Sequence, residues 1–202
     1  MIILHPRSSQ SASVLRMFRL LPALILLYGL GHSAGLAQMK PTISAGLAMT
    51  PPMGWNSWNH FACKVDEKVI RDTADALASS GMRDAGYQYL VIDDCWHGER
   101  DPHGDIQADP QRFPSGIKAL ADYVHSKGLK FGIYSDAGVK TCAGRPGSRG
   151  YEFQDAAQYA KWGVDYLKYD WCNTSTQNAQ ASYKIMREAL DHTGRPIVFS
   201  LL

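Results

Sequence analysis

The sequence predicts an α/β protein, a (β/α)8 TIM barrel of which about the first five strands are present in this chain. Short apolar runs alternate with amphipathic segments that end at glycine, as is typical of a parallel sheet with helical crossovers. Polar side chains gather at the C-terminal ends of these runs, where a barrel builds its active site. A doubly wound sheet usually has a glycine-rich phosphate loop after its first strand, and residues 56–59 form no such loop.

Each strand and helix is predicted from local signals. Apolar and aromatic residues dominate the predicted strands, which are residues 53–58, 89–94, 129–136, 164–173 and 197–202. Helices are predicted to begin at Asp66, at Ser115, near Phe153, and at Thr174 or Ser175. Glycine, a common residue after a helix, closes them at Gly81, Gly128, Gly163 and Gly194. The polar residues at the strand ends are Asn56, Trp58, Asp93, Asp94, Tyr134, Asp136, Lys168 and Asp170.

The pattern of residues 1–37 predicts a secretory signal peptide. A basic region ends at Arg19, an apolar run covers residues 20–30, and Gly35-Leu36-Ala37 supplies the small residues that precede a cleavage site. The apolar run is about half the ~20 residues needed to span a bilayer, so export is favoured over the alternative, an uncleaved N-terminal anchor. We expect a secreted or periplasmic protein, with residues 38–202 as the N-terminal portion of the barrel.

The charge balance gives no sign of a nucleic-acid or membrane-surface partner. The formal net charge is +2, but residues 1–37 hold three arginines and no acidic residue, so the remainder has a net charge of −1. A chain with that balance lacks the basic surface that nucleic acids and anionic membranes attract. We therefore expect no membrane contact after the signal is cleaved.

The segment of residues 164–173 contains the sharpest chemical signal. Lys168, Asp170 and Cys172 occupy alternate positions, so in a strand their side chains share one face. A cation beside a carboxylate favours the ionised acid, which is the state that a nucleophile needs. A structural ion pair at the end of a strand explains the same spacing, and the spacing alone leaves both interpretations open.

A metal site is not predicted. His97 and His103 lie in an acidic stretch, but their spacing matches no zinc or calcium pattern, and a solvated loop is the preferred interpretation. The four cysteines contain no Cys-x-x-Cys pair, and in an exported chain they predict two disulfides. We expect no cofactor.

Several motifs occur together in the order and spacing of one family. They are Met53-Gly54-Trp55-Asn56-Ser57-Trp58, Asp93-Asp94-Cys95-Trp96, Ala108-Asp109-Pro110-Gln111-Arg112-Phe113-Pro114, Gly132-Ile133-Tyr134-Ser135-Asp136, Thr141-Cys142-Ala143-Gly144 and Lys168-Tyr169-Asp170. The chain resembles the N-terminal half of an α-galactosidase (melibiase), from the family that also holds the α-N-acetylgalactosaminidases. The resemblance covers residues 47–200. It implies a barrel followed by a β-sandwich and a retaining exo-glycosidase that removes terminal α-galactosyl residues from oligosaccharides, galactomannan or glycolipids.

The resemblance also implies roles for individual residues. Asp170 resembles the nucleophile, and the residues that resemble the sugar-binding positions are Trp58, Asp93, Asp94, Tyr134, Cys142 and Lys168. Retention needs two carboxyl groups about 5–5.5 Å apart, one to attack and one to protonate the leaving oxygen, and Asp170 suits the first role. Adjacent aspartates point to opposite faces of a regular strand, but at a strand end both could reach one sugar. Trp55 is expected in the core, and Trp58 as a platform for the sugar.

The disulfides are predicted as Cys63–Cys95 and Cys142–Cys172. Each pair joins the connections that follow two neighbouring strands, and the family resemblance implies the same pairing.

The resemblance places the general acid/base on a later strand, beyond Leu202. We therefore expect residues 1–202 to be inactive and poorly soluble alone, because the outer strands would be open edges. Alternative functions are an α-N-acetylgalactosaminidase, a β-L-arabinopyranosidase, or a secreted carbohydrate-binding protein without catalytic activity. The sequence does not predict an oligomeric state.

Overall fold

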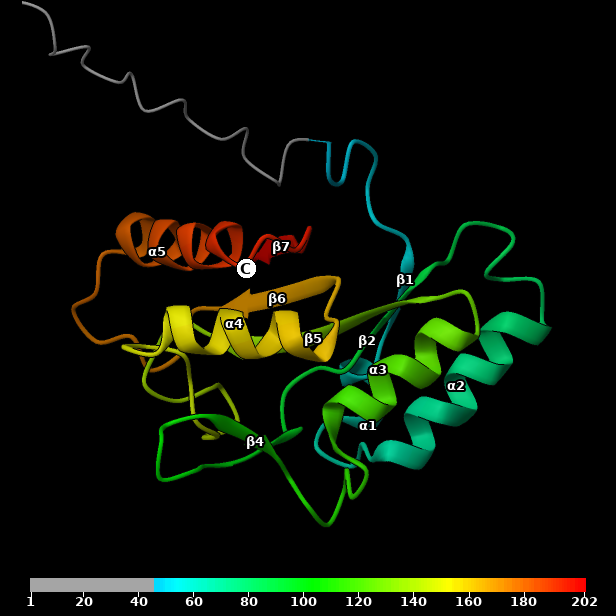
Figure 1. Cartoon of the computed structure of the whole chain (residues 1–202), viewed down its shortest axis with the longest axis horizontal. Coiled ribbons are helices and arrows are strands. Elements are labelled where there is room, and N and C mark those ends of the chain that lie inside the picture. The colour runs from blue at the N-terminus through cyan, green and yellow to red at the C-terminus, as the bar shows by residue number, and fades with distance from the viewer. Residues whose placement is uncertain (1–45) are drawn as a thin grey trace, which may run out of the picture. The chain divides into compact units, whose positions relative to one another are not determined.

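The computed structural model describes residues 46–202, which form a five-stranded parallel sheet and a separate hairpin (Figure 1). The strands of the sheet are β1 (Gly54–Asn56), β2 (Tyr89–Val91), β5 (Lys130–Asp136), β6 (Tyr166–Asp170) and β7 (Val198–Leu201). Their order in space is their order in the chain, as the first five strands of a barrel require. The predicted fold class is confirmed, and β1 and β7 are the two edges of this sheet.

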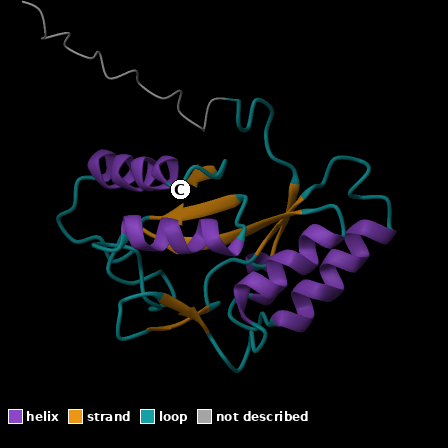
Figure 2. Cartoon of the chain, in the orientation of Figure 1, coloured by secondary structure: helices purple, strands orange, loops and turns teal. Residues whose placement is uncertain are grey.

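Helices cover one face of the sheet (Figure 2). They are α1 (Trp58–Phe61), α2 (Glu67–Ser79), α3 (Gly116–Ser126), α4 (Glu152–Trp162) and α5 (Ala179–His192). Alternate residues of the central strands, such as Leu90, Phe131 and Leu167, are fully buried against these helices. Each such side chain contributes about 1.5–3 kcal/mol to folding. The core therefore lies between the sheet and the helices.

The polar residues of the strands lie on the opposite face. Tyr134 pairs in register with Lys168, and Asp136 with Asp170, so these four side chains project from the same face of β5 and β6. Because all five strands are parallel, their C-terminal ends meet at one edge of the sheet. The fold thus gathers the polar strand ends in one place.

The ends of the helices follow the predicted signals in part. Asp66 caps α2 by accepting a hydrogen bond from the Val69 backbone N–H at 2.8 Å, and Gly163 ends α4 in the left-handed conformation at φ 83°. Ser115 stands at the N-cap of α3, but its side chain makes no capping hydrogen bond.

The predicted start of the last helix at Thr174 or Ser175 is wrong. The α5 helix begins at Ala179, and Asn178 caps it by accepting a hydrogen bond from the Ala181 N–H at 2.9 Å. Ser175 has a φ of 53°, which is outside the helical region, and Thr174 is buried. Several residues in this stretch suit an N-cap, so local preference could not select the correct one.

The connection of residues 95–114 contains an antiparallel hairpin of β3 (His97–Arg100) and β4 (Ile106–Ala108). Arg100 anchors it by a bidentate ion pair with the buried Asp155 of α4, with N–O distances of 2.6 and 2.7 Å. The same guanidinium donates to the carbonyls of Gly104 and Gly147. The hairpin is therefore fixed against the connection that follows β5.

The predicted signal peptide of residues 1–37 lies outside the described residues. Within residues 46–202, none of the helices has the length and apolar character that a membrane crossing requires.

Candidate active site

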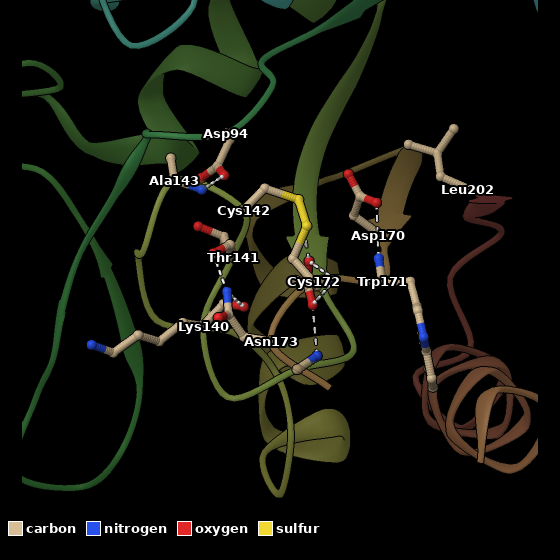
Figure 3. Close-up of a disulfide and its surroundings, with 12 residues drawn as sticks. Asp94, Lys140, Thr141, Cys142, Ala143, Asp170, Trp171, Cys172, Asn173 and Leu202 are labelled. Carbon is tan, nitrogen blue, oxygen red and sulfur yellow. Dashed lines mark hydrogen bonds between the residues drawn. A yellow bond between two sulfur atoms is a disulfide. The ribbon is translucent and has the colours of Figure 1, made fainter. Parts of the chain in front are cut away.

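Asp170 is the last residue of β6 and is half-buried at the polar edge of the sheet. Its Oδ2 accepts a hydrogen bond from the Tyr134 hydroxyl at 3.1 Å, and its Oδ1 accepts one from the Trp171 backbone N–H at 2.8 Å (Figure 3). Both donors fix the direction of the carboxylate. Asp170 and Tyr134, predicted as site residues from separate motifs, are thus direct neighbours.

Lys168 pairs with Asp93 and not with Asp170. Its Nζ lies 2.7 Å from Asp93 Oδ2, and the two side chains are 19% and 2% exposed. The sequence placed Lys168 and Asp170 on one face and left a structural ion pair between them open, and the structure pairs the lysine with Asp93 instead. Asp93 follows β2, which β5 separates from β6, so a residue 75 positions away in sequence is the partner in place of a neighbour two positions away.

Asn56 and Ser57 complete the surroundings of Asp93. The Asn56 amide donates to Asp93 Oδ2 at 2.7 Å, and the backbone N–H of Asp93 donates to Ser57 Oγ at 3.0 Å. Neither residue was predicted to bind substrate. The available signal was a polar pair at the C-terminal end of the first strand.

Asp94 points into the connection that follows β5. Its Oδ2 accepts a hydrogen bond from the Ala143 N–H at 2.9 Å, and its Oδ1 accepts one from the Cys95 N–H at 2.6 Å (Figure 3). Burial raises the pKa of the Asp94 carboxyl above its usual value. Asp93 and Asp94 are each 1% exposed, and each of their four carboxylate oxygens accepts at least one hydrogen bond.

His97 is buried, so its prediction as part of a solvated loop is wrong. Its ring stacks on Trp96 with centroids 4.0 Å apart, and Nδ1 lies 3.8 Å from Asp94 Oδ1. Burial lowers the pKa of His97 to about 3, so the ring is neutral at ordinary pH. The β3–β4 hairpin, which the sequence did not predict, carries it inward. His103, in the turn of that hairpin, is exposed as predicted.

Asp136 was not predicted as a site residue, although it was recognised at the end of its strand. It is fully buried beside Asp170, and its two oxygens accept backbone hydrogen bonds from Gly138 and Cys172. Burial raises its pKa to about 6, and the negative charges of Asp170 and Asp94 act in the same direction.

Both predicted disulfides are confirmed. Cys63 bonds to Cys95, and Cys142 to Cys172, with Cα–Cα distances of 5.2 and 5.1 Å. The second bond joins the connection after β5 to the end of β6, and Asn173 reinforces it by donating to the Thr141 carbonyl at 2.9 Å (Figure 3). Cys172 lies beyond the last residue of β6, so strand alternation no longer applies to it.

The cluster of Asp136, Cys142, Asp170 and Cys172 has one atom of each side chain within 4.8 Å of the others. The two sulfurs are joined to each other, so they are not available as thiolate ligands for a metal ion.

Trp58 is the predicted site residue least connected to this cluster. It begins α1, is 37% exposed, and its backbone N–H donates to Asn56 Oδ1 at 2.9 Å. In residues 46–202, no hydrogen bond or ring contact joins the Trp58 ring to Asp170 or Lys168. Trp55 packs against the core, as predicted.

The site therefore consists of the half-buried carboxylate of Asp170, which two donors orient, together with the separate Lys168–Asp93 ion pair and the buried Asp94. Asp136 lies close to Asp170, but backbone N–H groups occupy both of its oxygens, so it is badly placed to protonate a leaving group. A carboxylate in such surroundings can attack an electrophilic carbon or stabilise a cationic one.

Comparison with known proteins shows which family the chain resembles. The model of a family described as alpha galactosidase A matches residues 50–202. Alpha-galactosidase A of Cellvibrio japonicus is 62% identical over 179 residues, which are 87% of this chain and 44% of that protein. The chain thus spans less than half the length of this relative.

Solved structures of related enzymes superimpose on the sheet and helices. Alpha-galactosidase I from Mortierella vinacea has a TM-score of 0.75 at 53% identity, and the match covers 77% of this chain and 41% of that enzyme's chain. The Saccharomyces cerevisiae enzyme with raffinose has a TM-score of 0.76 at 46% identity, covering 80% of this chain and 37% of its own.

More distant neighbours are named for other activities. A β-L-arabinopyranosidase from Geobacillus stearothermophilus has a TM-score of 0.68 at 28% identity, covering 77% of this chain and 49% of its own. A putative alpha-N-acetylgalactosaminidase from Bacillus halodurans has a TM-score of 0.67 at 26% identity, and the match covers 77% of this chain and 50% of that protein. Because the family model matches most of the described residues and the nearer relatives share both sequence and fold, the chain belongs to the alpha-galactosidase A family of glycoside hydrolases.

Proposed function

We propose that this chain supplies the nucleophile half of the active site of a retaining exo-α-galactosidase. The observation that carries the proposal is the half-buried carboxylate of Asp170 at the end of β6, oriented by Tyr134 and Trp171 at the polar edge of the sheet. The names of the more similar relatives support galactose as the sugar, and the raffinose bound to the Saccharomyces cerevisiae enzyme supports an oligosaccharide substrate.

In the proposed mechanism, Asp170 attacks the anomeric carbon of the bound galactosyl group. The bond to the leaving oxygen breaks on the opposite face, and a general acid protonates that oxygen. Water then displaces Asp170 with a second inversion, so the product keeps the α configuration. We assign the general acid/base to none of the buried aspartates near Asp170, because both oxygens of Asp94 and of Asp136 already accept backbone N–H hydrogen bonds.

Lys168 and the two buried aspartates are assigned to sugar binding. The Lys168 Nζ has hydrogen-bonding capacity left after its pair with Asp93, and its side chain is part-exposed. Trp58 and the Cys142–Cys172 disulfide form the walls of the proposed pocket. The part-exposed Trp58 ring offers an apolar platform for one face of the sugar.

The nucleophile is tested by replacing Asp170 with Gly in protein expressed from the complete reading frame. Turnover of an aryl α-galactoside should fall by about 10⁴-fold or more, because the step that forms the covalent intermediate is lost. Added azide should enter the vacated space and attack from the same side, so the product should be the β-galactosyl azide.

A matched control is Asp122→Asn, which changes an exposed aspartate of α3 that pairs only with Lys118. This variant should keep normal activity and give no azide product. An α-azide product, or near-normal turnover by Asp170→Gly, would show that Asp170 is not the nucleophile.

Two alternatives within the family are separated by substrate. The Geobacillus stearothermophilus and Bacillus halodurans neighbours make β-L-arabinopyranosides and α-N-acetylgalactosaminides the competing substrates. A panel of the three nitrophenyl glycosides should show the largest kcat/KM for the α-galactoside. Tight binding of galactose without turnover of any of them would favour the carbohydrate-binding alternative.

We also propose that residues 1–37 direct export, which supplies the oxidising compartment that two disulfides require. N-terminal sequencing of protein recovered outside the cytoplasm should begin near residue 38. An intact N-terminus in a membrane fraction would support the uncleaved anchor instead.

A further inference from the structure

Asp136 is a buried carboxylate that the proposed reaction does not yet use. It ends β5, stands in register with Asp170 at the end of β6, and is 0% exposed. One oxygen of each carboxylate lies within 4.8 Å of the other. Two acids this close are uncommon in a core unless something compensates for the repulsion.

The compensation comes from the backbone. Asp136 Oδ1 accepts a hydrogen bond from the Gly138 N–H at 2.6 Å, and Oδ2 accepts one from the Cys172 N–H at 2.9 Å. The second contact holds the chain two residues beyond Asp170, at the cysteine that bonds to Cys142. Asp136 thereby ties the turn after β5 to the turn that positions Asp170.

The charged surroundings of Asp136 are acidic. Asp170 faces it from β6, Asp94 from the turn after β2, and Tyr134 lies on its own strand. The nearby Lys168 is engaged with Asp93. The sulfurs beside it form a disulfide and do not titrate. An ionised Asp136 is therefore a fixed negative charge next to Asp170.

We propose that Asp136 is a positioning residue that holds the backbone after Asp170 and keeps a negative charge beside it, which favours the attack of Asp170 on the sugar. The inference rests on the proposed function of Asp170. During attack an Asp170 oxygen bonds to the anomeric carbon, the bond to the leaving oxygen breaks, and that oxygen takes the proton of the general acid. Asp170 becomes a neutral ester, so repulsion from Asp136 is relieved as the reaction proceeds. The same charge attracts the cationic anomeric carbon of the transition state.

The first experiment compares Asp136→Asn with wild type and with Asp122→Asn, in protein from the complete reading frame. With an activated aryl α-galactoside, the rate of glycosyl-enzyme formation at pH 7 should fall about tenfold or more in Asp136→Asn only. In wild type this rate should rise as Asp136 ionises near pH 6, and the rise should be absent from Asp136→Asn. A slower variant with an unchanged pH profile would reduce Asp136 to a structural role and overturn the proposal.

The second experiment needs no variant, so it decides the matter even if Asp136→Asn does not fold. Carboxyl-carbon NMR follows the titration of Asp136 in two complexes of the wild-type protein. One holds galactose without a covalent bond, and the other holds a fluorosugar bonded to the nucleophile. Both fill the site, but only the second removes the charge of Asp170.

The titration midpoint of Asp136 should be lower by about one unit or more in the covalent complex, because a like charge within 4.8 Å has been neutralised. Equal midpoints would overturn the proposal. Peptide mapping of the covalent complex separates this result from a failure of the proposed function. A label on a residue other than Asp170 would overturn the nucleophile assignment and the role of Asp136 with it.

Discussion

Two parts of the polar edge of the sheet differ in how their acids are balanced. The balanced cluster consists of Asn56, Asp93 and Lys168, in which a lysine and an amide both bind one carboxylate oxygen at 2.7 Å. The acidic pair consists of Asp136 and Asp170, which stand side by side in register. In the described part of the chain, neither member of the acidic pair takes part in an ion pair.

This difference separates the part that holds the site together from the part that contains the proposed nucleophile. In the balanced cluster the charges cancel, so it joins β1, β2 and β6 and presents Lys168 in one orientation. In the acidic pair, two neighbouring carboxylates repel each other, and the backbone N–H groups that bind Asp136 only partly offset this unfavourable energy. A carboxylate that is not neutralised by a cation remains available to attack carbon.

Breaking the balanced cluster should have the largest effect on stability. Replacing Lys168 with Met leaves Asp93 buried without its cation, so the free energy of unfolding at pH 7 should fall by about 3–5 kcal/mol. Urea titration measures this loss, and Lys118→Met is the control. Its exposed pair with Asp122 should contribute less than about 1 kcal/mol.

The double variant Lys168→Met/Asp93→Asn should recover most of that stability but no activity, because the buried charge has gone and the lysine has not returned. A single variant as stable as wild type would show that the lysine does not balance Asp93.

The turn that supports the acidic pair is tested by removing the Cys142–Cys172 disulfide. The double Ala variant should lose about 2–4 kcal/mol of stability and also most of its activity, because the bond holds the turn after Asp170. The Cys63–Cys95 double Ala variant should lose similar stability but keep more activity per folded molecule. Equal loss of activity in both would contradict a special link between the second disulfide and Asp170.

The acidic pair also predicts how stability depends on pH. The pKa of Asp136 is about 6, above the value of about 3.9 in an unfolded chain, so its protonated form favours the folded state. This contribution is fully present below about pH 4 and is lost as the pH rises through about 6. Between those two pH values the free energy of unfolding of the wild type should fall by up to about 3 kcal/mol relative to that of Asp136→Asn. Parallel pH curves from denaturant titrations would contradict the raised pKa.

The smallest effect is expected for Tyr134→Phe, which removes only the hydroxyl that donates to Asp170 at 3.1 Å. Turnover should fall about tenfold, which corresponds to about 1.4 kcal/mol, with little change in stability because the ring still fills its buried site. A steady-state assay and a melting curve on the same sample measure both. A melting temperature that falls as far as that of the disulfide variant would show that the hydroxyl is mainly structural.

The sequence alone predicted the order of the five sheet strands and the four longer helices, because the periodicity of apolar residues is local and survives without tertiary contacts. It also indicated both disulfides, since each cysteine follows a strand whose neighbour the parallel topology defines. Asp170, Tyr134 and Lys168 were placed at the correct edge of the sheet for the same reason.

Which of these groups pair with one another depends on the tertiary structure. Lys168 pairs with Asp93 across the intervening β5, because both side chains project from the polar side of the sheet, and no spacing along one strand reveals that. His97 is buried because the hairpin to which it belongs, which lacks a strong local sequence pattern, carries it inward. Asp136 became notable only when its burial and its register with Asp170 were known. Ion pairing and burial depend on side chains that are far apart in sequence, and those arrangements exist only once the sheet has formed.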